Sequence, residues 1–117
     1  MAKKFPVTIY HNPKCGTSRN VLEMIEAAGH KPEVIEYLKI GWTKKQLKEL
    51  FAAAGLTPRE ALRSNAPEAE SLLNEEVSDA KILDAMVDHP ILVNRPIVVT
   101  PKGARLARPK ERVEEIL

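Results

Sequence analysis

The single cysteine of the chain, Cys15, is the residue whose type and setting point most directly to covalent chemistry. It lies where a short alternating segment ends and a helical pattern begins, so the free backbone N–H groups of residues 16–19 can converge on one small volume. Such a position binds an anion and favours the thiolate over the thiol. A protonated His11 or a neighbouring guanidinium would lower the pKa of the thiol further. Cys15 is therefore predicted to be a nucleophile, the alternative being an inert core cysteine.

Ser18 stands three residues after Cys15, where a C-x-x-C oxidoreductase carries its second cysteine. With one cysteine the chain cannot close an internal disulfide, so any redox cycle must take electrons from a thiol on another molecule. We expect Ser18 to form a hydrogen bond in the first turn of the helix, and a contact with a ligand is a compatible second role.

The segments around Cys15 predict a β-α-β unit. Residues 5–11 alternate between apolar and polar types and are rich in β-branched side chains, which predicts a strand that ends before Pro13. Apolar residues then recur at helical spacing from Val21 to Ala28, and Gly29 stands where a helix cap belongs. Residues 32–38 predict a second strand. The two strands should be parallel, with a right-handed crossover.

The middle of the chain, about residues 43–89, predicts a helical insert. Residues 43–46 and 57–60 both fit the capping-box pattern, so each should begin a helix. The first helix should run to about Ala54, and the second should cover residues 61–63. Two further helices are expected around residues 72–73 and 78–87, before Pro90.

The C-terminal part predicts a hairpin and a last helix. Residues 97–100 and 104–107 read as strands joined by a tight turn at 101–103, and Pro109 should open a helix to Leu117. The complete order is β-α-β, helical insert, β-β-α. This α/β order predicts a thioredoxin-like fold with a mixed four-stranded sheet, built as a single domain over residues 1–117.

Composition excludes several classes of protein. A chain of 117 residues with 44% hydrophobic and 29% charged residues can bury a core, so it should fold. A formal net charge of +2 and 4% aromatic residues argue against a nucleic-acid-binding protein. No apolar run approaches the roughly 18 residues of a membrane span, and the first residues do not resemble an export signal. We therefore expect a cytoplasmic monomer that binds neither nucleic acid nor membrane.

Three blocks of sequence, spread over almost the whole chain, carry a family resemblance. They are His11-Asn-Pro-Lys-Cys-Gly-Thr-Ser-Arg-Asn20, Leu62-Arg-Ser-Asn65, and residues 94–109 with Asn94-Arg-Pro96 and Gly103-Ala-Arg-Leu-Ala-Arg-Pro109. Together they resemble the glutaredoxin-dependent arsenate reductases. The resemblance implies that a cysteine attacks arsenate, that three arginines hold the oxyanion, and that glutathione and glutaredoxin supply electrons. By position, the nucleophile is Cys15 and the catalytic arginines are Arg63, Arg95 and Arg108.

The chemistry of these residue types agrees with the resemblance. Arsenate is a tetrahedral oxyanion, and a planar guanidinium can bind two of its oxygens at once. The backbone N–H groups of Gly16, Thr17 and Ser18 would complete the oxyanion site. The resemblance also implies a supporting role for His11 and a cis bond before Pro96, although X-Pro bonds in general are mostly trans. Glutathione would be a co-substrate, and no metal or tightly bound cofactor is expected.

Two features differ from the best-known reductases of this type. The sequence ends at Leu117, where those proteins continue, and Ala107 occupies a position that can hold another cysteine. Neither difference removes an expected catalytic group, but both leave open which thiol system is the partner.

Two other functions are compatible with the fold. One is a non-catalytic RNA-polymerase-binding regulator of the Spx type, which usually carries the C-x-x-C motif that Ser18 interrupts. The other is a glutathione-dependent thiol-disulfide oxidoreductase, such as a monothiol glutaredoxin, whose motif is not matched here. A cysteine phosphatase is disfavoured because Arg19 follows Cys15 too closely for a C-x5-R loop. Arg19 is instead expected to pair with Glu23, one helical turn away.

Overall fold

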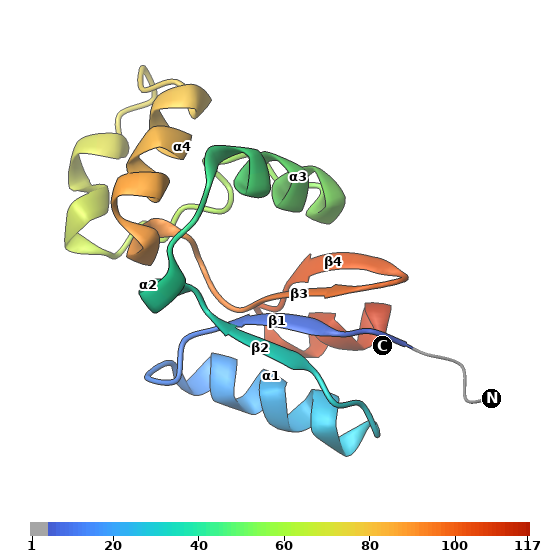
Figure 1. Ribbon diagram of the computed structural model, residues 1–117. Helices are drawn as coiled ribbons and strands as arrows, with labels where there is room; N and C mark the ends of the chain where they lie inside the picture. The colour runs from blue at the N-terminus through green and yellow to red at the C-terminus, as the bar shows by residue number, and fades with distance from the viewer. Residues whose placement is uncertain (1–4) are drawn as a thin grey trace. The chain divides into compact units, whose positions relative to one another are not determined.

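A four-stranded mixed sheet forms the centre of the first of two units into which the chain divides (Figure 1). The computed structural model describes residues 5–117. The first unit contains the chain up to Glu36 together with Arg95–Leu117, and the second contains Tyr37–Asn94. The expectation about export signals falls partly on residues 1–4, which lie outside the described residues. The expectation of one domain with an insert at 43–89 stays a prediction.

The strands of the first unit occur in the order β2-β1-β3-β4. They are β1 (Thr8–His11), β2 (Glu33–Glu36), β3 (Ile97–Thr100) and β4 (Gly103–Leu106). β1 pairs in parallel with β2 and antiparallel with β3, and β3 and β4 form the expected antiparallel hairpin. The predicted mixed sheet and the thioredoxin-like order of elements are therefore confirmed.

One face of the sheet is covered by α1 (Gly16–Ala27) and by the 3-10 helix η3 (Lys110–Ile116) (Figure 1). Ile9 of β1 packs there with Val21 and Ile25 of α1 and with Val113 and Ile116 of η3, all almost fully buried. Burial of such apolar side chains is the main force that holds helices on a sheet. The last helix is thus present as predicted, but it is a 3-10 helix.

Residues along β1 alternate in burial, because successive side chains of a strand point to opposite faces. Ile9 and His11 are buried, while Thr8 and Tyr10 are only partly buried. His11 therefore projects from the same face as Ile9, the face that α1 covers. This places a polar ring at the point where the core meets the first turn of α1.

The second unit contains α2 (Tyr37–Ile40), α3 (Lys44–Ala54), η1 (Pro67–Leu72), α4 (Asp79–Asp88) and η2 (Pro90–Leu92). The capping box that opens α3 is confirmed, since Thr43 accepts from the N–H of Gln46 and the Gln46 side chain accepts from the N–H of Thr43. Gly55 ends α3 in the left-handed conformation, with φ of 68°. Ser78 caps α4 by accepting from the N–H of Lys81.

The strand expected over residues 32–38 is present as β2, but it is shorter than predicted. It ends at Glu36, because Tyr37 begins α2 and its ring stacks on Trp42 with centroids 5.2 Å apart. Both aromatic side chains are buried, so their packing favours the helical turn over a longer strand.

The helix expected over residues 57–63 does not form. The reciprocal hydrogen bonds between Thr57 and Glu60 are present, at 2.9 and 3.1 Å, but the chain makes a single turn. Leu62 then pairs with Val93 in an isolated antiparallel bridge, and the N–H of Arg63 donates to the carbonyl of Leu92 at 2.8 Å. Backbone groups of Leu62 and Arg63 are therefore paired with residues 92–93 and are not available for the hydrogen bonds of a helix.

Candidate active site

Cys15 is the N-cap residue of α1 and is 8% exposed. Its N–H donates to the carbonyl of Asn12 at 3.0 Å, and its own carbonyl accepts from the N–H of Arg19 at 3.0 Å. The side chain of Asn12 accepts from the N–H of Lys14 at 3.0 Å, so the loop is a tight turn with an Asx contact. The sulfur is thereby fixed beside the free N–H groups of the first helical turn.

A buried hydrogen-bonded pair lies behind this loop. His11 Nδ1 is 2.6 Å from the hydroxyl oxygen of Ser18, and that oxygen also accepts from the N–H of Asn12 at 3.1 Å. Ser18 is fully buried. One hydroxyl therefore joins the end of β1, the loop and the first turn of α1.

The His11 ring carries little positive charge at neutral pH. Burial lowers the pKa of His11 below 6.5, and the charge of Arg19 lowers it further, whereas Glu36 acts in the opposite direction. A neutral imidazole can accept the Ser18 proton at Nδ1. The contact that His11 makes at this site is a hydrogen bond, so the charge beside the sulfur must come from elsewhere.

Two arginines supply that charge. Arg108 Nη1 lies 3.8 Å from Cys15 Sγ and also donates to the carbonyl of Arg95 at 3.1 Å. The sheet register explains this meeting. Tyr10 pairs with Ile97, and Ile97 pairs with Leu106, so the end of β1, the start of β3 and the end of β4 share one edge of the sheet. The Arg95–Pro96 bond is cis, as the resemblance implied, and so is Arg108–Pro109.

The pKa of the Cys15 thiol is lowered from 9.0. Burial raises it, but the combined effect of the Ser18 backbone N–H, the charge of Arg95 and hydrogen bonds from Arg95 and Arg108 is larger. The guanidinium groups and a helix N–H therefore hold the sulfur as a thiolate more readily than an ordinary cysteine.

Arg63 belongs to the second unit, whereas Cys15, Arg95 and Arg108 belong to the first. It directly follows the bridge residue Leu62, and its N–H is bound by Leu92. Its Nε is buried and has no hydrogen-bond partner among residues 5–117. The structure thus brings together five of the predicted site residues in the first unit, and Arg63 belongs to the second. The five are His11, Cys15, Ser18, Arg95 and Arg108.

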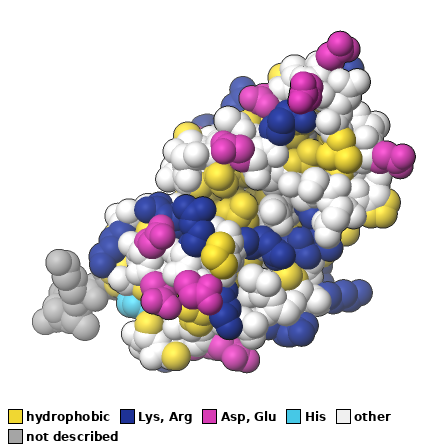
Figure 2. Space-filling view, turned by 180° about the vertical axis from the view of Figure 1, so that it is seen from behind, with side chains coloured by type: hydrophobic (Ala, Val, Ile, Leu, Met, Phe, Trp, Pro, Cys, Tyr) yellow, Lys and Arg dark blue, Asp and Glu magenta, His cyan; other side chains and the backbone are white. Residues whose placement is uncertain are grey.

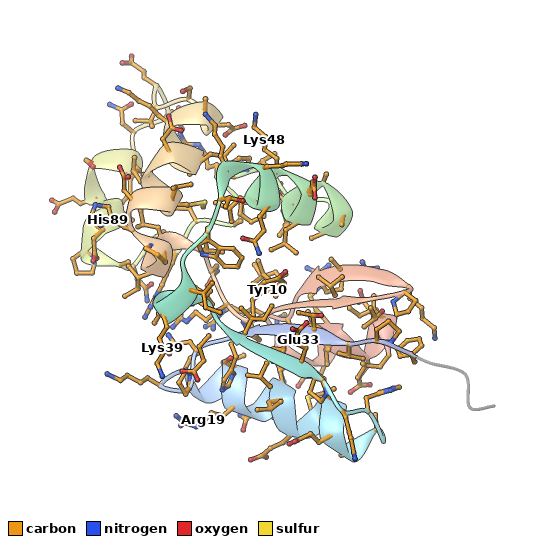
Figure 3. All side chains as sticks on the ribbon, in the orientation of Figure 1. Tyr10, Arg19, Glu33, Lys39, Lys48 and His89 are labelled. Atoms are coloured by element: carbon orange, nitrogen blue, oxygen red, sulfur yellow. The ribbon has the colours of Figure 1, made fainter. Side chains whose placement is uncertain are left out.

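Arg19 has a role that the sequence analysis missed. Its Nη1 donates to the carbonyl of Pro13 at 2.8 Å, so it holds the loop before Cys15, in place of the expected pair with Glu23. Arg19 lies on the side of α1 that points away from the sheet, whereas Tyr10 lies on the sheet (Figure 3). Its position four residues after Cys15 was visible in the sequence, but the free carbonyl of Pro13 was not.

The charged surface agrees with the balanced composition. On the face shown in Figure 2, acidic and basic side chains are interspersed. Over residues 5–117, no helix is both long and apolar enough to cross a membrane. Within the same range, histidine, cysteine and carboxylate side chains nowhere gather in threes to hold a metal ion.

Comparison with known proteins identifies close relatives. A model of the ArsC family matches residues 10–116. An arsenate reductase from Synechocystis sp. is 68% identical over 95% of this chain and 81% of its own length, and an arsenate reductase from Escherichia coli K12 is 50% identical over 95% and 80%. The solved structure of an arsenate reductase from Vibrio cholerae has a TM-score of 0.92 and 40% identity, covering 98% of this chain and 100% of that one.

Proposed function

This chain belongs to the ArsC family, and from that premise we propose that it is an arsenate reductase that uses Cys15 as its nucleophile. The single observation that carries the assignment is the guanidinium of Arg108, 3.8 Å from the sulfur of Cys15. A cation in that position stabilises the thiolate and can also bind an oxygen of the substrate. The family's relatives named as arsenate reductases support arsenate as that substrate.

In the first step, the Cys15 thiolate attacks the arsenic atom of arsenate. A sulfur–arsenic bond forms, an arsenic–oxygen bond breaks, and the oxygen leaves as water after taking up protons. The negative charge on the remaining oxygens is stabilised by the N–H groups of Gly16, Thr17 and Ser18 and by the guanidinium groups of Arg95 and Arg108. Arg63 is assigned as the third arginine on the basis of the sequence resemblance.

In the second step, the sulfur of glutathione bonds to arsenic and a second oxygen leaves as water. The two sulfur atoms on arsenic then join as a disulfide between glutathione and Cys15, both sulfur–arsenic bonds break, and the electron pair left on arsenic reduces it from As(V) to As(III). This reduction needs two electrons, which is the number released when two thiols form one disulfide. Arsenite leaves, and glutaredoxin removes the glutathione held in the mixed disulfide. An external thiol is needed because the chain has one cysteine.

The test is NADPH consumption that depends on arsenate, in the presence of glutathione, glutaredoxin and glutathione reductase. The wild-type chain should turn over, and Cys15→Ser should lose all measurable activity because it lacks the nucleophile. Phosphate added as a competitor reports how well the site selects arsenate. Full turnover by Cys15→Ser, or turnover of a glutathionylated disulfide without any response to arsenate, would contradict the assignment. The regulator alternative is not favoured by the relatives described above.

A further inference from the structure

A hollow of about 290 Å³ opens beside the nucleophile, lined by Thr17, Arg108, Pro109, Lys110 and Glu111. Its volume lies close to the lower limit of the roughly 300–1,000 Å³ that is typical of small-ligand sites. All five residues belong to the first unit. Arg108 lines the hollow and also contacts Cys15 Sγ at 3.8 Å, and Thr17 follows Cys15 by two positions, so two lining residues connect the hollow to the reactive sulfur.

The charges on the walls of the hollow are unusual for a site that binds only an oxyanion. Lys110 and Glu111 are neighbours in the chain and carry opposite charges, and both side chains are exposed. Neither takes part in an ion pair within residues 5–117. A carboxylate such as Glu111 repels arsenate, so it is suited to a different part of the reaction, in which a positively charged group must be bound.

We propose that this hollow binds the γ-glutamyl end of glutathione and directs its thiol toward the arsenic held on Cys15. The assignment rests on the proposed function, because it is the second step of that reaction that uses glutathione. The γ-glutamyl end carries an α-carboxylate and an α-ammonium group on one carbon atom. This pair of opposite charges complements the adjacent Lys110 and Glu111, with Lys110 facing the carboxylate and Glu111 facing the ammonium group.

The arrangement would give the enzyme a preference among thiols. Small thiols without a γ-glutamyl group could still reach the arsenic but would gain nothing from Lys110 and Glu111. Since an exposed ion pair contributes at most about 1 kcal/mol, the preference should amount to about twofold to fivefold in KM for each charged contact.

The first experiment compares Lys110→Glu with the matched control Lys31→Glu in the coupled arsenate assay. Lys31 is exposed and lies beyond the opposite end of α1 from Cys15, so the control makes the same change of charge far from the hollow. Lys110→Glu should raise the KM for glutathione about tenfold and leave the KM for arsenate unchanged. Equal glutathione KM values for the two variants, with a wild type that reduces arsenate, would overturn the site but not the proposed function.

The second experiment assigns Glu111 to the ammonium group. In the wild type, N-acetylglutathione should have a KM about threefold higher than glutathione, because acetylation removes the positive charge. In Glu111→Gln the two thiols should be equivalent, which a general loss of folding could not produce. An unchanged ratio of KM values in Glu111→Gln would contradict the assignment.

A binding measurement separates the site from turnover. The Cys15→Ser protein is titrated with S-methylglutathione, which cannot react, and the backbone amide signals are followed by NMR. Saturable shifts centred on Thr17, Lys110 and Glu111 are expected. Shifts confined to other residues, or none, would overturn the site whether or not the wild type reduces arsenate. Binding of S-methylglutathione at these residues of Cys15→Ser, together with a wild type that does not reduce arsenate, would instead disprove the proposed function.

Discussion

The segments that carry Cys15 and Arg63 are both irregular stretches held by side-chain hydrogen bonds to the backbone, but the bonds lie in different surroundings. At Cys15, the buried hydroxyl of Ser18 holds the loop, with an additional, exposed hydrogen bond from the guanidinium of Arg19. Next to Arg63, Arg59 donates to the carbonyls of Leu72, Asn74 and Val77, at 3.3, 3.2 and 2.6 Å, in a partly exposed setting.

The difference matters because a buried polar group has no water to replace a lost partner. Deleting a single polar atom in the segment around Cys15 should therefore lower both stability and activity. In the segment around Arg63, water can replace a lost protein partner, so a substitution there should lower stability but have little effect on activity. This contrast can be tested with paired variants in the two segments.

The largest effect is expected from Arg108→Lys. Lysine keeps the charge but loses the planar fork, so kcat/KM for arsenate should fall about 10²-fold. The pKa of Cys15 should rise toward 9.0, because a hydrogen bond that lowers it is lost. Both are measurable, by the coupled assay and by titration of thiolate absorbance. Arg105→Lys, in which the ion pair with Glu115 can persist, is the matched control, and equal pKa values in the two variants would contradict the role of Arg108.

Ser18→Ala tests the buried segment directly. The change leaves His11 Nδ1 and the N–H of Asn12 without their partner, so unfolding in urea should show a loss of about 1–3 kcal/mol. Activity should fall as well, since the same hydroxyl positions the loop before Cys15. Ser64→Ala, at an exposed residue, should change neither quantity. Wild-type stability in Ser18→Ala would show that the buried hydrogen bonds of Ser18 do not stabilise the segment around Cys15.

Arg59→Ala tests the partly exposed segment. Three carbonyl partners are lost, but water can reach at least one of them, so a loss of about 1–2 kcal/mol is expected in the same urea experiment. Lys45→Ala, at an exposed residue on α3, serves as the control. Arg59→Ala should lower kcat/KM much less than Ser18→Ala does. If the two variants lost kcat/KM to the same extent, the two segments would not differ in the way proposed.

The smallest effect concerns pH. Because the pKa of His11 is lowered in the folded state, the unfolded chain binds more protons below about pH 6.5. The contribution of His11 to stability is therefore fully present above pH 6.5 and is lost as the pH falls through the folded pKa. In His11→Gln this part of the pH dependence should disappear, so its unfolding free energy should change less between pH 7 and pH 5 than that of the wild type. Equal slopes would indicate that His11 is not held in its neutral form.

Much of the fold followed from local sequence. The alternation in residues 8–11, the apolar period of α1, and the capping box at Thr43 each predicted the element that is observed. These signals work because they describe interactions between residues a few positions apart. The candidate nucleophile was predictable for the same reason, since a lone cysteine at a strand-to-helix junction has a recognisable local setting.

The sequence by itself determined which residues could do the chemistry and where most elements begin. Tertiary structure decided the rest. The capping pattern at Thr57 equals the one at Thr43, yet only the latter opens a helix, because Leu62 pairs with a strand-like segment 31 positions along the chain. In the same way, Arg108 reaches Cys15 across 93 positions only because the antiparallel register brings together the end of β1, the start of β3 and the end of β4. Contacts between distant residues depend on how strands align, and no local pattern encodes that alignment.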